Sequence, residues 1–289
     1  MSKLHMAACA IALAAIGAGG PGRAQTAGAA SLASPWVELH AARVRLIGGP
    51  GAAKAAKTYL AGVEITLSDG WKTYWRMPGD SGVPPVFSWA GSGNVAAVKV
   101  RYPAPMRLPE PTGDAIGYKR SVIFPIEVTP KDASKPVELK LGLEFGVCRE
   151  ICIPAEAKIA LSLAPAGLNG TPVAPIAAAL AAVPRPAAGR RAGDPEIERV
   201  AATLDGPAPR LQIEARFPGG DTGADLFVEA PDGLYVPMPQ RVAGSSAGGT
   251  VRFEVGLARG GNAGDFKGKT LTLTLVSDAG ATETTWAIP

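Results

Sequence analysis

Short runs of alternating apolar and polar residues fill most of the chain from Trp36 to about Leu163. The runs are broken by Gly, Pro and Asp, and they read WVELHAARVRL, YLAGVEITLSDG, WKTYW, VAAVKVRY, SVIFPIEV, VELKLGLEFGV and IPAEAKIALSL. A period of two over runs of this length is typical of antiparallel strands that bury one face. The pattern therefore predicts an all-β sandwich or barrel in this part of the chain.

The alternation stops in residues 164–194, where Ala, Pro, Gly and Arg dominate. We interpret this segment as a linker between two domains. It contains one predicted helix, from Pro172 to Ala182, with Thr171 as its N-cap. The apolar face of this helix would be formed by Val173, Ile176 and Leu180.

Strand patterns return after Pro195 in RLQIEARF, ADLFVEA, GLYVPM, TVRFEVGL, TLTLTLVS and TTWAI. These runs are enough for a second, smaller β-sandwich in residues 195–289. This part of the sequence contains neither Cys nor His. Candidate chemistry is therefore sought in the first domain, which we expect to span residues 25–163.

The N-terminal sequence MSKLHMAACAIALAAIGAGGPGRAQ combines Lys3 with an apolar run and with small residues before Gln25. This is the layout of a secretory signal peptide, residues 1–24, with cleavage after Ala24. No later stretch approaches the ~18 consecutive apolar residues that a spanning helix needs. We therefore expect a mature protein that is exported to the periplasm and does not span the membrane.

The net charge gives no support for nucleic-acid binding. The whole chain carries a formal charge of +4, and removal of Lys3 and Arg23 with the signal peptide leaves +2. Arg190 and Arg191 form the only basic cluster in the mature sequence. Because nucleic-acid affinity depends on concentrated positive charge, we expect no nucleic-acid partner.

Two cysteines lie four residues apart in FGVCREICIPAE, between two of the predicted strands. The apolar residues of VELKLGLEFGVC are all odd-numbered, whereas Cys148 falls on the other parity. In the strand that follows, Cys152 shares its parity with Glu156 and Lys158. Both thiols are therefore expected to leave the core face.

A turn of three residues, Arg149-Glu150-Ile151, would pair the two strands with apolar residues opposite apolar residues. In this register Cys148 lies opposite Cys152. Further pairs are Phe145 with Ala155, Gly146 with Pro154, and Leu141 with Ile159. Directly opposed residues have Cα atoms ~4.5 to 5.5 Å apart, which permits a disulfide.

The size of the ring closed by such a disulfide indicates how much the disulfide can stabilise the fold. The loop-entropy relation gives about 2 kcal/mol for a five-residue ring, against ~4.7 kcal/mol for a loop of a hundred residues. An exposed bridge at a hairpin tip stabilises little but is open to attack by a thiolate. We therefore favour exchange chemistry, with a structural disulfide in a binding module as the alternative.

Several separated motifs carry a resemblance to a known family. The segments DGWKTYWRMPGDSGVPP, RYPAP, GYKRSVIFPIEV and LKLGLEFGVCREICIPAEAKIAL occur in this order. Together they resemble the N-terminal periplasmic domain of the DsbD and ScsB transmembrane thiol:disulfide reductases. The resemblance covers about Trp36 to Leu163 and is weaker through the linker helix and the second domain.

The resemblance implies an immunoglobulin-like fold whose two cysteines relay electrons to periplasmic, thioredoxin-like partner proteins. It implies that Cys152 forms the mixed disulfide and that Cys148 resolves it. A short loop that covers the pair should fall near Met106 to Asp114, just before Tyr118. Candidate supporting residues are Tyr118, Trp71 and Tyr74.

The sequence departs from this family in two ways. It contains neither the membrane electron-transfer segment nor the C-terminal thioredoxin-like domain. Its electrons would then come from another protein, such as a membrane thiol reductase, unless the relay role has been lost.

Metal binding is the rival class of function. Cys148 and Cys152 could bind Cu(I), with Met77 or Met106 as an additional soft ligand. Zinc needs about four ligands, and these cysteines with His40 leave one to find. His40 alternates onto the polar side of its strand and is expected at the surface. We expect no resident metal and no cofactor.

Overall fold

The computed structural model describes residues 33–48, 58–111, 113–164, 173–244, 248–259 and 261–289. The predicted signal peptide, residues 1–24, lies outside these ranges. The described residues form an immunoglobulin-like, all-β fold with two pairs of sheets and the single α-helix of this part of the chain. The fold class that the alternation predicted is therefore confirmed.

The first sandwich consists of two antiparallel sheets. One has the order β1 (Val37–Leu39), β2 (Ala42–Gly48), β3 (Tyr59–Leu67), β9 (Ser121–Pro130), β6 (Val95–Val100). The other has the order β11 (Cys152–Leu163), β10 (Val137–Cys148), β4 (Lys72–Gly79), β8 (Ala115–Lys119), β7 (Met106–Leu108), with β5 (Val86–Ser88) also paired to β10. The core lies between them and is built mainly from every second residue of the long strands β2, β3, β9, β10 and β11.

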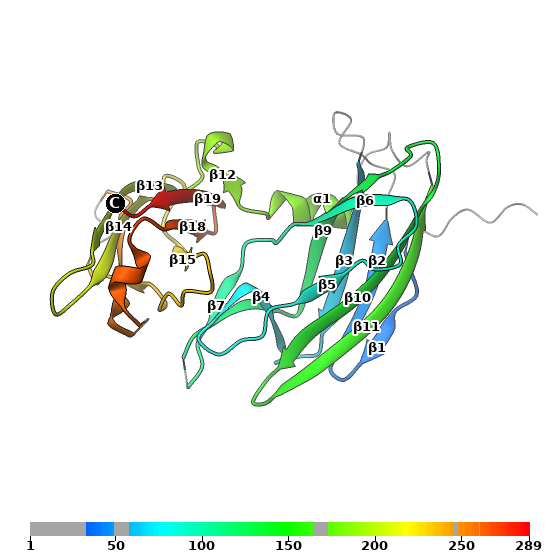
Figure 1. Ribbon diagram of the computed structural model, residues 1–289, viewed down its shortest axis with the longest axis horizontal. Coiled ribbons are helices and arrows are strands. Elements are labelled where there is room, and N and C mark those ends of the chain that lie inside the picture. The colour runs from blue at the N-terminus through cyan, green and yellow to red at the C-terminus, as the bar shows by residue number, and fades with distance from the viewer. Residues whose placement is uncertain (1–32, 49–57, 112, 165–172, 245–247, 260) are drawn as a thin grey trace, which may run out of the picture. The chain divides into compact units, whose positions relative to one another are not determined.

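The hairpin of β10 and β11 carries the cysteines and has the predicted register. Twelve consecutive Cα pairs join the strands, from Val137 opposite Leu163 to Cys148 opposite Cys152. The odd-numbered residues of β10 are all buried in the core, as their alternation predicted. Figure 1 shows the two strands as a long green pair. The turn therefore lies at one end of a long, regular ladder.

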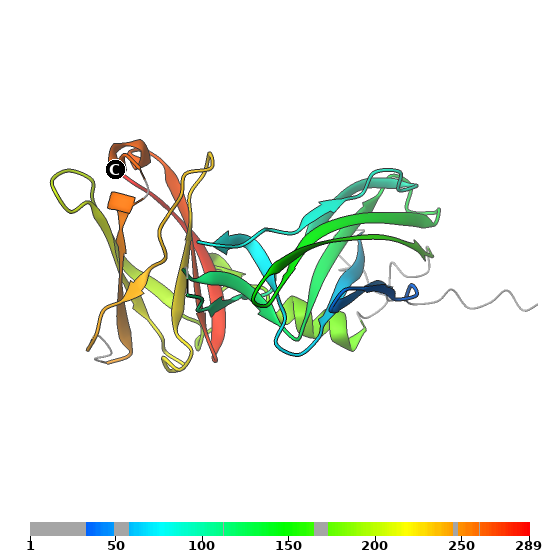
Figure 2. The ribbon, with the colours of Figure 1, turned by 90° about the horizontal axis from the view of Figure 1, so that it is seen from below.

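The linker helix α1 spans Ala174–Ala181 and is shorter than predicted. Its N-cap is Val173, with no side-chain cap; the predicted N-cap Thr171 lies outside the described residues. Ile176 is fully buried against Ile47 and Leu60 of β2 and β3. The predicted apolar face is confirmed, and α1 covers the outer face of the β3 and β9 strands, as Figure 2 also shows.

The second sandwich also has two sheets. One has the order β12 (Arg185–Pro186), β19 (Gly280–Ala287), β18 (Thr270–Ser277), β15 (Asp225–Glu229). The other has the order β13 (Glu196–Thr203), β14 (Arg210–Arg216), β17 (Thr250–Gly256), β16 (Gln240–Arg241). A separate apolar core fills the space between these sheets. The boundaries of the two domains stay a prediction.

Two details of the second sandwich differ from the predicted strands. The sequence pattern missed β13, because this edge strand is only half-buried and carries charged residues. It also predicted a strand in GLYVPM, residues 233–238, but these residues form no strand. Pro237 and Pro239 have no N–H to donate to a ladder, which accounts for the missing strand.

Candidate functional site

The candidate site is the disulfide at the tip of the β10–β11 hairpin. Cys148 ends β10, Cys152 begins β11, and the predicted turn Arg149-Glu150-Ile151 connects them. The two sulfurs are bonded, and the Cα atoms are 4.1 Å apart. The predicted pairing of the cysteines is confirmed.

The two cysteines differ in exposure, which corrects the expectation that both are open to attack. Cys152 is exposed, whereas Cys148 is 1% exposed. Both leave the core face, but a second small apolar cluster of Tyr74, Leu108 and Ala115 covers Cys148 on the outer face. The cover comes from β4, β7 and β8, which are distant in sequence and which the parity of β10 alone does not reveal.

Tyr74 lies across the hairpin and reaches the exposed sulfur. A Cβ atom on Gly146 would come within 3.0 Å of the Tyr74 ring, so the absence of a side chain there leaves room for it. The Tyr74 hydroxyl is 3.1 Å from Cys152 Sγ. Burial, and then the charge of Glu110, raise the pKa of Tyr74 to about 12. The hydroxyl therefore stays protonated near neutral pH and can donate a hydrogen bond to the sulfur.

A buried lysine forms an ion pair near the disulfide. Lys72 on β4 is directly opposite Cys148 in the sheet and is 9% exposed. Its Nζ donates a hydrogen bond to the Arg149 carbonyl at 3.2 Å and lies 2.8 Å from Glu110 Oε1. Lys72 thus joins the turn of the hairpin to the segment that follows β7.

The segment from Met106 to Asp114 lies where the family resemblance placed a covering loop. It begins as β7, whose last residue, Leu108, packs in the same cluster as Cys148. Glu110 then pairs with Lys72, and Arg107 pairs with Asp114 at 2.9 Å. Leu108 of this segment therefore covers Cys148, whereas Cys152 is exposed.

The other two candidate residues, Trp71 and Tyr118, do not contact the sulfurs in the same way as Tyr74. Trp71 lies beside the turn, with the Arg149 guanidinium 5.4 Å from its ring centre and the ring of the exposed His40 at 5.4 Å. Tyr118 is not at the disulfide: it lies in the interior core, and its hydroxyl donates to the Pro103 carbonyl at 2.8 Å. Burial raises the pKa of Tyr118 well above its usual value.

An apolar hollow of ≈ 440 Å³ adjoins the exposed sulfur. Its lining includes Cys152 and two valines that are more than half exposed, Val83 and Val86. The remaining lining residues are Pro84, Glu144, Phe145, Gly146, Pro154, Ala155 and Glu156. Ile151 in the turn is 68% exposed. Exposed apolar side chains therefore gather beside Cys152.

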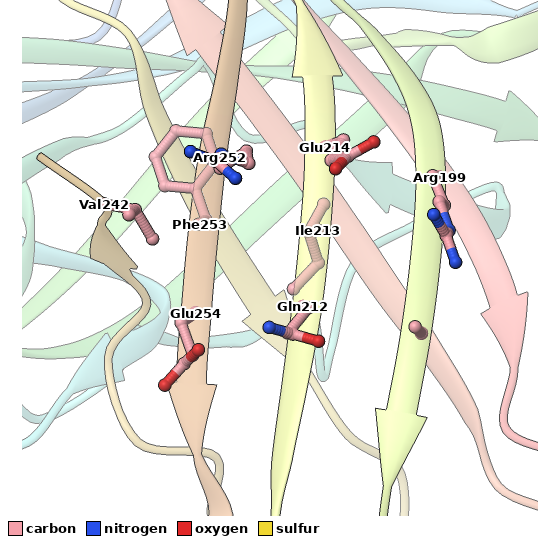
Figure 3. Close-up of a pocket in the computed structure, with 9 residues that line it drawn as sticks. Arg199, Gln212, Ile213, Glu214, Val242, Arg252, Phe253 and Glu254 are labelled. Atoms are coloured by element: carbon pink, nitrogen blue, oxygen red, sulfur yellow. The ribbon is translucent and has the colours of Figure 1, made fainter. Parts of the chain in front are cut away.

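A second hollow, of ≈ 210 Å³, lies on the outer face of the β13-β14-β17-β16 sheet. Figure 3 shows its polar side chains on neighbouring strands. Glu214 stands between Arg199 and Arg252 in the register, and Gln212 stands opposite Glu254. Opposite charges on adjacent strands stabilise a sheet surface, and this hollow contains no nucleophile.

The described part of the chain contains no group of three or more His, Cys, Asp or Glu side chains placed to hold a metal ion. Of the proposed soft ligands, Met77 packs against the interior core, whereas Met106 is exposed. Among the described residues, no helix is long and apolar enough to cross a membrane.

Copper binding provides a direct test of the rival function. Met77 lies on the core side of β4, away from the face that carries Lys72 and Tyr74. We therefore expect the reduced protein to bind Cu(I) no more tightly than an ordinary dithiol, and Met77→Leu or Met106→Leu to leave the affinity unchanged. Competition with a chromogenic Cu(I) chelator measures this. A tight 1:1 complex with Cu(I) that either substitution weakens would support metal binding as the function.

The fold and the site define an immunoglobulin-like protein with a disulfide at the tip of a hairpin. Residues 50–164 match the family model of the thiol:disulfide interchange protein DsbD, N-terminal domain. The matched residues contain the β10–β11 hairpin with both cysteines, so the first sandwich is similar to a domain of this thiol:disulfide interchange family. Residues 182–289 match the model of a domain of unknown function, DUF8393.

Among solved structures, the N-terminal periplasmic domain of ScsB from Proteus mirabilis is similar, with a TM-score of 0.68 at 24% identity. The match covers 89% of this chain and 98% of that chain. The C-terminal domain of the AgI/II polypeptide BspA from Streptococcus agalactiae is much less similar, with a TM-score of 0.15 at 8% identity over 83% of this chain and 95% of that chain. A search of curated proteins found no match.

Proposed function

We propose that this protein exchanges electrons with periplasmic partner proteins through a reversible Cys148–Cys152 disulfide. The observation that carries the proposal is the unequal exposure of the two cysteines: Cys152 is exposed and Cys148 is 1% exposed. Thiol–disulfide exchange needs one sulfur that an incoming thiolate can reach and one that leaves. The periplasmic location is supported by the similarity to the periplasmic domain of ScsB.

The exchange step conserves atoms and electrons. A partner thiolate attacks Cys152 Sγ, the Cys148–Cys152 bond breaks, and its electron pair stays on Cys148 as a thiolate. A second partner thiolate then attacks the partner sulfur of the mixed disulfide and releases Cys152 as a thiolate. The pair is now reduced, and the partner is oxidised by two electrons. The same steps in reverse reduce a partner disulfide, with Cys152 as nucleophile and Cys148 as resolving thiol.

The surroundings of Cys152 supply two further elements of this function. The Tyr74 hydroxyl, 3.1 Å from Cys152 Sγ, donates a hydrogen bond to the thiolate that forms there. The adjoining apolar hollow receives the segment of a thioredoxin-like partner that flanks its reactive cysteine. Trp71 supports the turn through its contact with Arg149. A membrane thiol reductase is the proposed electron source.

Trapping tests the proposal. In Cys148→Ser, the Cys152 thiolate can attack a partner disulfide, but the resolving thiol is missing. We therefore expect this variant to accumulate mixed disulfides in the periplasm, visible as bands that disappear on reduction. Mass spectrometry of the purified adducts identifies the partners and the cysteine that they occupy.

The matched control is Cys152→Ser, which keeps one thiol but places it under Leu108 and Tyr74. It should accumulate few or no adducts. Equal trapping by both variants would contradict the assignment of Cys152 as the attacked sulfur, and adducts from neither would contradict the exchange function.

A further inference from the structure

One charged side chain near the disulfide has no role in the exchange step described above. Lys72 is buried, although an ammonium group loses hydration when it is buried and is rarely found there without a functional or structural partner. Its position directly opposite Cys148 places the two side chains on the same face of adjacent strands. Directly opposed Cβ atoms in an antiparallel pair are ~4.5 to 5.5 Å apart.

The Lys72 side chain follows the hairpin toward its tip. Its Nζ donates a hydrogen bond to the carbonyl of Arg149, the residue directly after Cys148. The ammonium is therefore held beside the end of β10, where the buried sulfur lies. Cys148 itself has little contact with solvent, so water contributes little to the stability of a negative charge on its sulfur.

Other charged groups flank this position, but they are more exposed or of the wrong sign. The titratable side chains around Cys148 are Lys72 and Tyr74 on β4, Lys119 on β8, Glu110 after β7, and Arg149 and Glu150 in the turn. Lys119, Arg149 and Glu150 are exposed, so solvent screens them. Tyr74 stays neutral at physiological pH because its pKa is raised to about 12. Lys72 is therefore the buried cation of this group.

We propose that Lys72 stabilises the thiolate that Cys148 becomes when a partner thiolate attacks Cys152. The proposal rests on the proposed exchange function for its biological meaning. In that step the Cys148–Cys152 bond breaks and its electron pair moves to Cys148 Sγ, beside the Lys72 ammonium. A stabilised thiolate is a better leaving group, so Lys72 acts as a positioning residue that speeds the opening of the disulfide.

The ion pair between Lys72 and Glu110 leaves Lys72 able to interact with a thiolate on Cys148. Glu110 Oε1 lies 2.8 Å from Nζ, but this buried oxygen accepts no hydrogen bond. The two side chains therefore attract each other as opposite charges without an aligned hydrogen bond. Such an ion pair is weaker than one that also forms a well-aligned hydrogen bond. When the disulfide opens, Lys72 interacts with two anions, Glu110 and the Cys148 thiolate. Glu110 therefore competes with the thiolate for Lys72, and its loss should favour the thiolate.

The pKa of the Cys148 thiol tests this inference directly. In a Cys152→Ser background, Cys148 is the single thiol of the mature chain, and the pH dependence of its absorbance at 240 nm reports its pKa. Lys72→Met should raise this pKa by about one or more, because an opposite charge on the neighbouring strand favours the ionised form of the thiol. Lys72→Arg should keep most of the effect, and Glu110→Gln should lower the pKa.

The rate of opening gives a second readout with both cysteines present. Dithiothreitol should reduce the disulfide of Lys72→Met roughly threefold or more slowly than that of the unchanged protein, since a thiol of higher pKa leaves more slowly. Glu110→Gln should be reduced faster. Lys119→Met is the matched control: it removes the exposed lysine opposite Lys72 on β8 and should change neither the rate nor the pKa.

These measurements use a single-thiol protein and a small dithiol, so they do not depend on any natural partner. Failure to trap a partner would count against the exchange function and leave the thiolate result unaffected. Identical Cys148 pKa values in the Cys152→Ser protein with and without Lys72→Met would overturn the inference. If Lys72→Met does not fold, Glu110→Gln decides, and a pKa that does not fall in this variant overturns the inference.

Discussion

Iodoacetamide should alkylate Cys152 at least tenfold faster than Cys148 in the reduced, folded protein. The reagent must reach the sulfur, and exposure together with thiolate character sets the rate. Cys152 is exposed at the tip of the hairpin, whereas Cys148 is covered by Tyr74 and Leu108. Quenched time points followed by mass spectrometry of the two peptides give both rates in one experiment.

Leu108→Ala distinguishes cover from intrinsic reactivity. Leu108 is 2% exposed and packs in the cluster of Cys148. Shortening this side chain should speed alkylation of Cys148 several-fold and leave the rate at Cys152 unchanged. Equal alkylation of both cysteines in the folded protein would contradict the buried state of Cys148, and full equality is expected only after unfolding.

The alternation of apolar residues predicted the hairpin well because the local pattern sets both strands. In β10 and β11, every second residue packs into the core, and a slip of one residue would expose that whole set. The pairs Leu141 with Ile159 and Phe145 with Ala155 follow from this requirement and are observed. The position of the cysteines opposite each other is a consequence of the same register.

The environment of the disulfide could not be predicted in the same way. Lys72, Leu108 and Glu110 come from segments far from the cysteines in sequence, and strand order brings them together. No periodicity within β10 indicates which strand will lie beside it. The sequence contained one indication of this environment. Lys72 and Tyr74 are two residues apart on β4, so their side chains lie on the same face of the sheet.

The same parity explains why Tyr118 is not at the disulfide. Gly117 is the residue opposite Tyr74, and Tyr118 is opposite Thr73. Opposed residues lie on the same face of a sheet, so Tyr118 points to the other face, into the core. The family resemblance placed the covering segment near Tyr118 along the chain, but it did not determine the face on which this side chain lies.

The second sandwich shows a different reason for missed elements. The edge strand β13 is half-buried and charged, so its alternation is weak. Residues 234–239 alternate well, but their prolines prevent a ladder. Hydrophobic periodicity predicts burial of a face, and the availability of backbone donors decides whether the segment also pairs.

The folded protein should equilibrate with a glutathione or dithiothreitol redox buffer in one reversible two-electron step. Its reduction potential should lie above the ~−300 mV that is typical of structural disulfides. We expect equilibration without unfolding because Cys152 is exposed and a small thiolate can attack it in the folded sandwich. We expect the higher potential because exposed disulfides are more easily reduced than buried structural ones. Thiol quantification across the buffer series, with circular dichroism at each point, measures the potential and the retention of the fold together.

Reduction should cost the fold little. The ring contains five residues, which corresponds to about 2 kcal/mol or less in the free energy of unfolding. Twelve Cα pairs between β10 and β11 hold the hairpin in register whether or not the sulfurs are bonded. Urea unfolding of the oxidised and reduced protein gives the difference, and the double variant Cys148→Ser with Cys152→Ser should behave like the reduced form. A bridge that resists reduction until the sandwich unfolds would show a structural disulfide, because the sulfur would then be reachable only in the unfolded chain.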